Sequence, residues 1–364
     1  MTVTHYHLKI RKITQETKDA LTVEFEHPED QKISYQAGQF LTLLVNIQGE
    51  SLRRAYSLCT SPLTDEFPAV TIKRVAGGKV SNYLNDTLKI GDVLEVLSPM
   101  GVFTTQYDAN QARHLILFAG GSGITPMMAI LKTALKEEPQ TLVSLVYANR
   151  DSQSIIFKEQ IKKLQQTYSE RLQVIHILEK APLFWSKGYK GRISTKILKK
   201  ILQDLPQMGT EATAYFMCGP NGMMNQIIQS FTELKLPIDR LKKESFGISP
   251  EEAAQKEERN VAQELDNQKS EAPKSHLVKV IYAGETYEFE VPPHKTILET
   301  AQSLDIDLPY SCQSGMCTAC LGRAISGKVK LDEEDALTPK ELEQGYVLTC
   351  VGHPITDDVV IKID

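Results

Sequence analysis

Hydrophobic and polar residues alternate along most of the first hundred positions. The alternation is clearest in five stretches, residues 5–14, 21–28, 39–49, 69–78 and 91–101. A period of two residues is typical of strands with one buried and one solvated face, and glycine or proline between the stretches marks turns. The pattern therefore predicts a closed antiparallel β-barrel over residues 1–108.

The pattern changes after about residue 112, where continuous apolar runs replace the alternation. These runs cover residues 113–120, 142–150, 172–179 and 212–219. Unbroken apolar strands are typical of parallel sheets that are covered on both faces. Residues 126–138, 157–168 and 221–235 have apolar positions with helical spacing. Strands that alternate with helices predict a doubly wound α/β domain over residues 109–249.

Residues 250–275 fit neither pattern. The segment carries seven acids and four bases, and Val261 and Leu265 are its only sizeable apolar residues. It cannot bury enough apolar surface to fold alone, so we expect a charged linker.

The pattern of residues 276–364 predicts a third domain, of the α+β class. It starts with a hairpin pattern around Ala283–Gly284, and a capping box of Thr296 and Glu299 predicts a short helix.

Composition and charge narrow the class of protein. The chain has 364 residues, of which 41 are Lys or Arg and 46 are Asp or Glu, for a formal net charge of −5. This balance gives no support to nucleic-acid binding. The first 14 residues lack the apolar core of a secretion signal, and no apolar stretch reaches the length of a membrane span. We therefore expect a soluble cytoplasmic protein, in which clustered cysteines are more often metal ligands or redox groups than disulfides.

Four cysteines near the end of the chain have a distinctive spacing. Cys312, Cys317, Cys320 and Cys350 form the pattern C-x4-C-x2-C-x29-C. Zinc sites usually pair their ligands in two short C-x2-C units, and only one such unit is present. The spacing is that of plant-type [2Fe–2S] ligation, and Gly315 allows the loop to pass close to inorganic sulfur. A zinc site and a set of buried thiols remain the alternatives.

The surrounding sequence strengthens the iron–sulfur interpretation. "LPYSCQSGMCTACLGRAISGKV" together with "YVLTCVGHP" resembles the plant-type ferredoxins over residues 276–364. The resemblance implies a β-grasp fold and assigns the four cysteines to a [2Fe–2S] cluster. Thr318 stands where the family often has glycine, a change that touches no ligand.

Two short motifs in the first domain suit a bound dinucleotide. In "RRAYS", Arg54 and Tyr56 lie two residues apart, so a strand would place both on one face. There Arg54 could pair with a diphosphate, Tyr56 could pack on a flat ring, and the Ser57 hydroxyl could bond to the ring edge. In "GGKVSNYL", Gly78 and Ser81 lie at a predicted helix start, which suits phosphate. A surface ion pair for Arg54 and a simple helix cap for Ser81 are the alternatives.

The second domain contains a glycine-rich turn between a buried strand and a helix. "FAGGSGITPMM" differs from the G-x-G-x-x-G fingerprint because Pro126 replaces the third glycine. Its glycines would still admit a pyrophosphate, and Thr125 with the helix amides could complete the anion site. A plain strand–helix turn is the alternative. Taken alone, Cys218 is interpreted as a cysteine buried in a strand, and Glu244 as a glutamate exposed to solvent.

Taken together, these motifs resemble the ferredoxin–NADP⁺ reductase superfamily. The resemblance implies FAD contacts from Arg54, Tyr56, Ser57, Lys73, Gly78, Lys79, Ser81 and Phe246. It implies nicotinamide-nucleotide contacts from Gly120, Gly121, Gly123, Thr125, Pro126, Cys218 and Gly219. It also implies catalytic roles for three residues: Ser57 near flavin N5, Cys218 beside the nicotinamide, and Glu244 as a proton-relay partner.

The choice of nucleotide depends on the residues after the second parallel strand. An acid there binds the ribose hydroxyls of NADH, whereas an arginine suits the 2′-phosphate of NADPH. Here Arg150 precedes Asp151, and Lys190 and Arg192 could add positive charge if the fold brings them close. We therefore predict NADPH, with NADH as the alternative.

The order of the three domains resembles the reductase components of multicomponent bacterial oxygenases. Within that group, "YANRDSQSIIFKEQIKKL" and "CQSGMCTAC" are most similar to the reductases of phenylacetyl-CoA epoxidase and 3-ketosteroid hydroxylase systems. The resemblance implies electron transfer from NAD(P)H through FAD and the cluster to a partner oxygenase. Three alternatives are a stand-alone ferredoxin or flavin reductase or redox sensor, the reductase of a Rieske-type hydroxylase, and a zinc-stapled binding protein.

Overall fold

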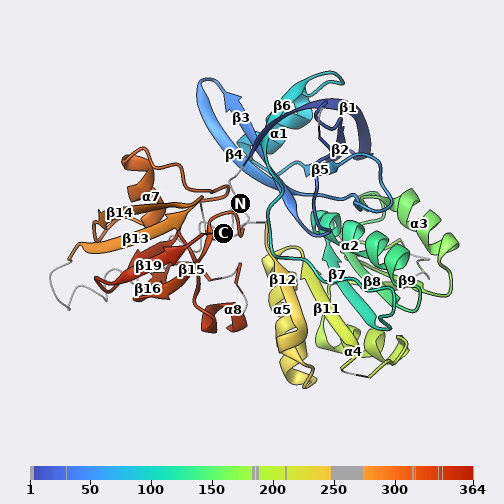
Figure 1. Cartoon of the computed structure of the whole chain (residues 1–364). Coiled ribbons are helices and arrows are strands. Elements are labelled where there is room, and N and C mark those ends of the chain that lie inside the picture. The colour runs from blue at the N-terminus through green and yellow to red at the C-terminus, as the bar shows by residue number, and fades with distance from the viewer. Residues whose placement is uncertain are drawn as a thin grey trace. The chain divides into compact units, whose positions relative to one another are not determined.

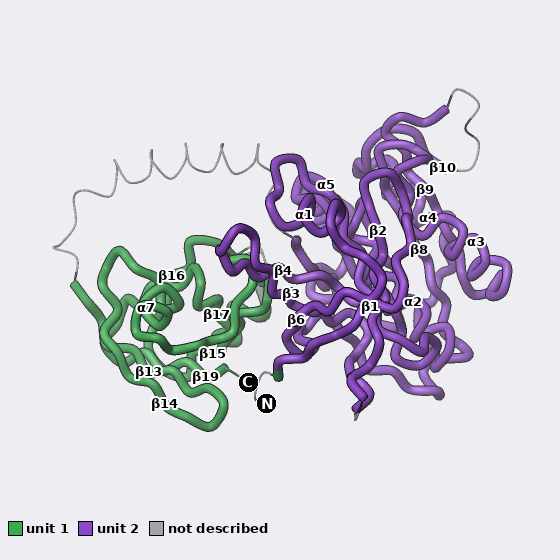
Figure 2. Tube along the Cα trace, turned by 90° about the horizontal axis from the view of Figure 1, so that it is seen from above, with its two compact units in different colours: residues 1–4, 247–364 green, residues 5–246 purple. Residues whose placement is uncertain are grey.

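The structure, a computed structural model, divides the chain into two compact units (Figure 2). One covers residues 5–246 and the other contains the C-terminal domain. The residues described are 4–29, 31–182, 185, 188–209, 211–246, 274–313, 315, 317–334, 336–337 and 339–363. Apart from its last two residues, the expected linker at 250–275 lies outside this described part. No described helix is long and apolar enough to cross a membrane.

An antiparallel sheet forms the first part of the larger unit (Figure 1). Its strands have the order β4-β3-β6-β1-β2-β5. They are β1 (His5–Thr17), β2 (Ala20–Phe25), β3 (Phe40–Ile47), β4 (Glu50–Ser57), β5 (Ala69–Lys73) and β6 (Val93–Leu97), with helix α1 (Lys79–Thr87) before β6. Inward-facing residues such as Leu8, Val23 and Leu43 are fully buried, which explains the alternation in the sequence. The sheet curls so that its outer strands approach, but only an isolated bridge between Leu58 and Val70 joins them. The predicted antiparallel fold is confirmed as a half-open barrel, not a closed one.

A parallel sheet with the strand order β10-β9-β8-β7-β11-β12 forms the second part. Its strands are β7 (His114–Gly120), β8 (Leu142–Asn149), β9 (Leu172–Leu178), β10 (Gly188–Lys190), β11 (Thr213–Cys218) and β12 (Leu241–Glu244). Its helices are α2 (Ile124–Glu137), α3 (Lys158–Thr167), α4 (Thr195–Asp204) and α5 (Asn221–Glu233), with short 3₁₀ turns η1 (Gly121–Gly123) and η2 (Ile238–Arg240). The doubly wound fold is confirmed. The elements β10, α4, η2 and β12 were not predicted.

The antiparallel and parallel parts share one hydrophobic core. Cys59 and Phe103 from the first part pack in the same buried cluster as Met127 and Ile130 of α2. Polar contacts join the same surfaces: Thr133 Oγ1 lies 2.8 Å from Ser61 Oγ, and Lys132 Nζ lies 2.7 Å from Asp65 Oδ2. Residues 5–246 therefore form one compact unit, and the expected boundary between residues 108 and 109 stays a prediction.

The C-terminal unit has a mixed five-stranded sheet with the order β14-β13-β19-β15-β17 and a separate β16–β18 ribbon. Its elements are β13 (His276–Tyr282), β14 (Glu285–Val291), α7 (Ile297–Ser303), β15 (Leu321–Ser326), β16 (Val329–Leu331), α8 (Pro339–Glu343), β17 (Tyr346–Leu348), β18 (Gly352–Pro354) and β19 (Val359–Lys362). Positive φ angles at Ala283 and Gly284 make the predicted hairpin turn. The predicted capping box is also present: Thr296 and Glu299 each bond to the other's backbone amide, at 3.1 and 2.9 Å.

Candidate functional site

Three predicted catalytic residues meet where the antiparallel and parallel sheets join. Ser57 ends β4 and is buried, and its Oγ donates a hydrogen bond to Glu244 Oε2 at 3.1 Å. Glu244 ends β12 and pairs across the parallel ladder with Cys218, the last residue of β11. The contact between Ser57 and Glu244 depends on how the two sheets pack together, because 187 positions separate the two residues in the sequence.

Burial sets the charge state of this cluster. It raises the pKa of Glu244 to about 8, against a smaller lowering by the Ser57 hydroxyl. Burial also raises the pKa of Cys218 well above its usual value, and the nearby Glu244 charge raises it further. Burial thus favours the protonated form of both the carboxyl and the thiol. A carboxyl that titrates near neutrality beside a hydroxyl can deliver or accept a proton.

The predicted phosphate turn packs backbone against backbone. A Cβ on Gly123 would lie 2.0 Å from the Cys218 carbonyl oxygen, and one on Gly219 would lie 2.9 Å from Gly120 Cα. The turns after β7 and β11 are thus as close as glycine allows. Thr125 Oγ1 donates to the Ser122 carbonyl oxygen at 3.0 Å, and Pro126 is buried in the first turn of α2. These residues shape a cradle at a helix start, which fits an anionic nucleotide.

Lys73 lies beside this turn, although it belongs to the antiparallel part. Its Nζ is 3.1 Å from the position that a Cβ would take on Gly121, whose φ is +53°. Burial lowers the pKa of Lys73, and the positive charge of Arg150 lowers it further. Lys73 and Arg150 are therefore close enough to repel each other. An anion bound between the two cations would offset this repulsion.

Arg150 and Asp151 follow β8 and have different surroundings. Asp151 Oδ1 accepts hydrogen bonds from the Gln153 amide, the Ser154 amide and Ser154 Oγ at 3.0, 2.9 and 2.7 Å. Asp151 Oδ2 lies 3.3 Å from Arg150 Nε, and the Ser154 hydroxyl is the largest cause of a lowered Asp151 pKa. The Asp151 carboxylate is thus engaged within its own loop, whereas Arg150 is exposed.

Lys190 and Arg192, predicted as further cations, lie around the end of β10. Strand β9 separates β10 from β8. Arg192 Nη2 pairs with Glu179 Oε1 at 2.8 Å and is largely exposed. The chain after β9 runs beside Arg150, because the Lys180 amide donates to the Arg150 carbonyl oxygen at 2.6 Å.

Arg54 and Tyr56 lie on one face of β4, as predicted. Leu43 and Leu41 of β3 are their respective neighbours in the ladder. Arg54 is exposed and its Nη1 donates to the Arg53 carbonyl oxygen at 2.7 Å. Burial raises the pKa of Tyr56 above its usual range, so its ring stays neutral. An exposed cation beside a partly buried ring fits a flavin with its diphosphate.

The predicted phosphate residues of the first domain surround the start of α1. Gly78 precedes the helix, and a Cβ there would lie 2.8 Å from Ser81 Oγ. Ser81 Oγ accepts from the Val75 amide at 3.1 Å, so it closes the turn. Lys79 pairs with Glu50. Phe246, the predicted aromatic neighbour of the flavin, is 44% exposed at the end of the unit.

The four cysteines of the C-terminal unit converge. Cys320 Sγ lies 3.2 Å from Cys350 Sγ. The thiol of Cys312 is the first cause of a raised pKa at both Cys317 and Cys350, which places Cys312 close to both. In the same loop, Gly315 has a φ of +69°. A loop that gathers four soft ligands fits a [2Fe–2S] cluster.

No group of three or more described His, Cys, Asp and Glu side chains has a geometry that could hold a metal ion. The cluster assignment therefore rests on the four-cysteine set and its spacing, and not on a preformed coordination sphere.

Two residues beside the nucleotide turn were not predicted. Tyr147 is fully buried in β8, and its hydroxyl donates to the Gly121 carbonyl oxygen at 2.9 Å. Asn149 as a whole residue is 8% exposed. Its side-chain amide lies beside the Tyr147 hydroxyl and lowers the phenol pKa that burial raises, although no hydrogen bond of normal geometry joins it to a described residue. Both lie in "LVSLVYANR", where the apolar pattern predicts only a buried strand. Sequence alone offered no signal that distinguishes them from core residues.

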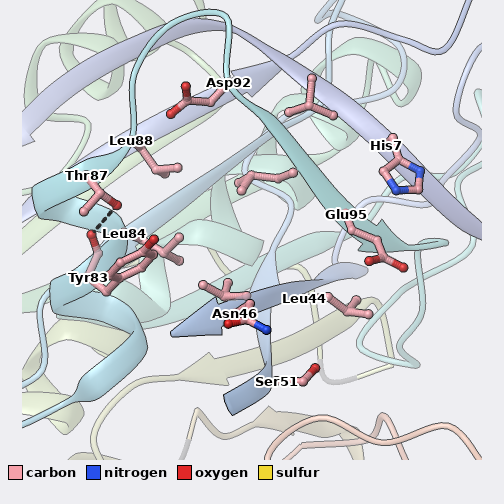
Figure 3. A pocket seen from close by; sticks show the side chains of 13 residues that line it. His7, Leu44, Asn46, Ser51, Tyr83, Leu84, Thr87, Leu88, Asp92 and Glu95 are labelled. Atoms are coloured by element: carbon pink, nitrogen blue, oxygen red, sulfur yellow. Dashed lines mark hydrogen bonds between the residues drawn. The ribbon is translucent and has the colours of Figure 1, made fainter. Parts of the chain in front are cut away.

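A groove of about 630 Å³ opens on the antiparallel part (Figure 3). It lies between α1 and the strands β3 and β6, which pair only at Leu43–Val96 and Leu44–Glu95. Tyr83, Asp92 and Glu95 are among the side chains that line it. None of the predicted site residues does so, and the groove is therefore separate from the site described above.

Comparisons with known proteins agree with this arrangement. Family models match for an oxidoreductase FAD-binding domain at residues 7–105, an oxidoreductase NAD-binding domain at 117–229 and a 2Fe-2S iron-sulfur cluster binding domain at 280–354. The ferredoxin reductase component of 3-ketosteroid-9-alpha-monooxygenase from Rhodococcus rhodochrous is 36% identical over 98% of this chain and 96% of that protein. One of the subunits of 1,2-phenylacetyl-CoA epoxidase from Escherichia coli K12 is 35% identical over 99% of this chain and 98% of that protein.

The arrangement also matches a solved structure. Phthalate dioxygenase reductase, described as a modular structure for electron transfer from pyridine nucleotides to [2Fe-2S], has a TM-score of 0.58. It is 23% identical, and the match covers 99% of this chain and 98% of that one. At this identity the likeness supports the three-part fold alone.

Proposed function

Because the chain belongs to the family of oxygenase reductase components with FAD-binding, NAD-binding and [2Fe–2S] domains, we propose that its electron donor is NADPH. We also propose that its acceptor is an oxygenase of the phenylacetyl-CoA epoxidase type. The contact that best supports hydride chemistry at the sheet junction is the one between Ser57 and Glu244, with Cys218 adjacent. A cytoplasmic location and domain limits of 1–108, 109–249 and 276–364, with a linker at 250–275, are parts of the proposal.

We assign the residues of the site by their positions. When bound, FAD accepts a hydride from the nicotinamide and releases single electrons to an iron–sulfur cluster. Arg54, Tyr56 and Ser57 bind and orient the flavin, while the start of α1 receives its diphosphate. The neutral Cys218 thiol offers a small uncharged surface beside the nicotinamide. Glu244 holds a proton at its carboxyl oxygen and exchanges it through Ser57 Oγ.

NADPH is favoured over NADH by the surroundings of Arg150. An NADH site needs a free carboxylate for the ribose hydroxyls, but the Asp151 carboxylate is engaged by its own loop. Arg150 is exposed and close to Lys73, whose Nζ lies beside Gly121, so two cations lie near the turn. We therefore assign Lys73 to the phosphates of the nicotinamide nucleotide in preference to FAD.

A charge-removal pair tests the nucleotide assignment. Arg150→Ala should raise the Michaelis constant for NADPH about tenfold or more, because a charge-assisted hydrogen bond to phosphate is lost, and should leave that for NADH nearly unchanged. Arg11→Ala is the matched control, since Arg11 of β1 is also exposed and paired with a carboxylate, that of Glu24. Ferricyanide reduction measures both. An equal effect of Arg150→Ala on the two nucleotides would contradict the NADPH assignment.

A second experiment tests the electron path. Cys317→Ser should abolish reduction of cytochrome c by NADPH, because the cluster loses a ligand, and should leave ferricyanide reduction intact. Iron and acid-labile sulfide analysis should give two of each per wild-type chain. Survival of both activities in the variant would remove the cluster from the path, and bound zinc in place of iron would support the binding-protein alternative.

The acceptor can be tested by reconstitution. A 3-ketosteroid hydroxylase is the second candidate, because the Rhodococcus reductase component is as similar to this chain as the epoxidase relative from Escherichia coli. NADPH-dependent product formation is measured with purified oxygenase components of each type. We expect turnover with the epoxidase components; turnover only with the hydroxylase would replace the first candidate. Turnover with neither would favour a stand-alone reductase.

A further inference from the structure

The hydroxyl of Tyr147 connects two loops that are far apart in the sequence. It donates to the Gly121 carbonyl oxygen at 2.9 Å, and it accepts a hydrogen bond from the Ile156 amide at 3.3 Å. The ring is fully buried, and burial raises the phenol pKa, so the hydroxyl always carries the proton it donates. Phenylalanine would fill the same space in the core. The hydroxyl is therefore needed for these two bonds and not for packing.

The second loop, residues 150–157, begins with Arg150 and is fixed at both ends. At its start, the Asp151 carboxylate accepts bonds from three groups of the loop. At its end, Phe157 has a φ of +60°, and its amide donates to Glu16 Oε2 at 3.2 Å. Glu16 belongs to β1 of the antiparallel part, where its Oε1 accepts from Thr22 Oγ1 at 2.9 Å. Consecutive amides of the loop thus bond to Tyr147 and to Glu16.

The two loops are the places that the proposed function assigns to two anionic groups of one nucleotide. The Gly121 turn would receive the diphosphate, and Arg150 the 2′-phosphate. A ligand that contacts two sites at once binds most tightly when the distance between the sites is fixed before binding. Tyr147 joins the Gly121 turn to the far end of the Arg150 loop with one buried group. The Asn149 side chain lies beside the same hydroxyl and lowers the phenol pKa.

We propose that Tyr147 is a positioning residue that determines nucleotide selectivity. Its hydroxyl holds the Arg150 loop at the distance from the Gly121 turn that NADPH requires. This inference rests on the proposed 2′-phosphate role of Arg150. Without the hydroxyl, the Arg150 loop shifts relative to the turn. The affinity for a nucleotide with a 2′-phosphate then falls more than the affinity for one without it.

The test removes only the hydroxyl. In the full-length holoenzyme, Tyr147→Phe should lower kcat/KM for NADPH about tenfold and for NADH about twofold, measured by ferricyanide reduction. Most of the loss should be in KM. The matched control is Tyr107→Phe, because the Tyr107 hydroxyl is also buried but has no hydrogen-bond partner among the described residues. It should leave the NADPH-to-NADH ratio unchanged. Equal losses for both nucleotides in Tyr147→Phe, or no loss, would overturn the inference.

A double variant separates this inference from its premise. If Tyr147 acts through Arg150, then Arg150→Ala with Tyr147→Phe should lose no more selectivity than Arg150→Ala alone. Multiplied losses would mean that the two residues act independently and would overturn the inference. If Arg150→Ala alters selectivity but Tyr147→Phe does not, only the inference fails. If Arg150→Ala leaves selectivity unchanged, the NADPH assignment and the inference fail together.

Discussion

At the scale of single residues, the environment of Glu244 leads to a pH effect on stability. Its folded pKa of about 8 lies above the ordinary value of 4.5. The folded state therefore binds more protons than the unfolded state between these values. The contribution of the protonated Glu244 carboxyl to the free energy of unfolding is fully present below about pH 4.5 and is lost as pH rises through 8.

Glu244→Gln should remove this dependence. Relative to the variant, the free energy of unfolding of the wild-type holoenzyme should fall between pH 5 and 8, by at most about 1.4 kcal/mol per pH unit. Urea unfolding at several pH values measures both. If the free energy of unfolding has the same pH dependence in the wild type and the variant, the Glu244 carboxyl has its ordinary pKa in the folded protein.

Gly123 gives a second prediction at this scale. Gly123→Ala would place a methyl group 2.0 Å from the Cys218 carbonyl oxygen, so the turns after β7 and β11 must separate. We expect a loss of about 1–3 kcal/mol in stability and a higher KM for the nucleotide. The control is Gly222→Ala, because no atom lies within 4 Å of a Cβ at that position. Unchanged nucleotide kinetics in Gly123→Ala would contradict the close packing of the turns.

Residue types with strict spacing could be predicted from the sequence, and contacts between distant side chains could not. The four cysteines were identified because cluster ligation fixes the short C-x4-C-x2-C intervals of the first three. The location of Lys73 at Gly121 and the two bonds of Tyr147 depend on how β5, β7 and β8 pack in three dimensions. No local pattern carries that information, so Tyr147 resembled any other buried strand residue.

At the scale of elements, helix α7 depends on its capping box. Thr296→Ala would remove the side-chain acceptor for the Glu299 amide, so this amide at the helix start would lose its hydrogen-bond partner. We expect a loss of about 1 kcal/mol in the stability of the C-terminal unit. Thermal loss of the cluster absorbance measures it. Thr296→Ser, which retains the acceptor, is the control, and an equal loss in both variants would argue against the cap.

Elements with strong periodicity were predicted, and short or polar ones were missed. The buried runs of β7 and β8 and the almost wholly buried helix α2 produce long apolar patterns in the sequence. Strand β12, with the sequence "LKKE", carries three charged residues and lies at the sheet edge. Its location is set by pairing with β11, which its own composition does not indicate.

At the scale of the whole molecule, the C-terminal unit has a core of its own. Val280, Leu348 and Ile361 are fully buried within it. Ile361→Ala should destabilise this unit by about 2–5 kcal/mol and lower the temperature at which the cluster is lost. Reduction of ferricyanide by NAD(P)H should persist, because the FAD-binding and NAD-binding domains lie within residues 5–246. Leu277→Ala, at a 42% exposed position of the same sheet, is the control. Loss of ferricyanide reduction in Ile361→Ala would show that the two units depend on each other.

The shared core of the antiparallel and parallel parts limits how such proteins can be recombined. In a chimera, the flavin-binding half of one relative would meet the nucleotide-binding half of another across the contacts of Ser61 and Asp65 with Thr133 and Lys132. These residues would have to be exchanged as a set. A crossover between Phe246 and Lys274 divides neither compact core, so the cluster domain is the part that protein engineers can transplant as a cassette.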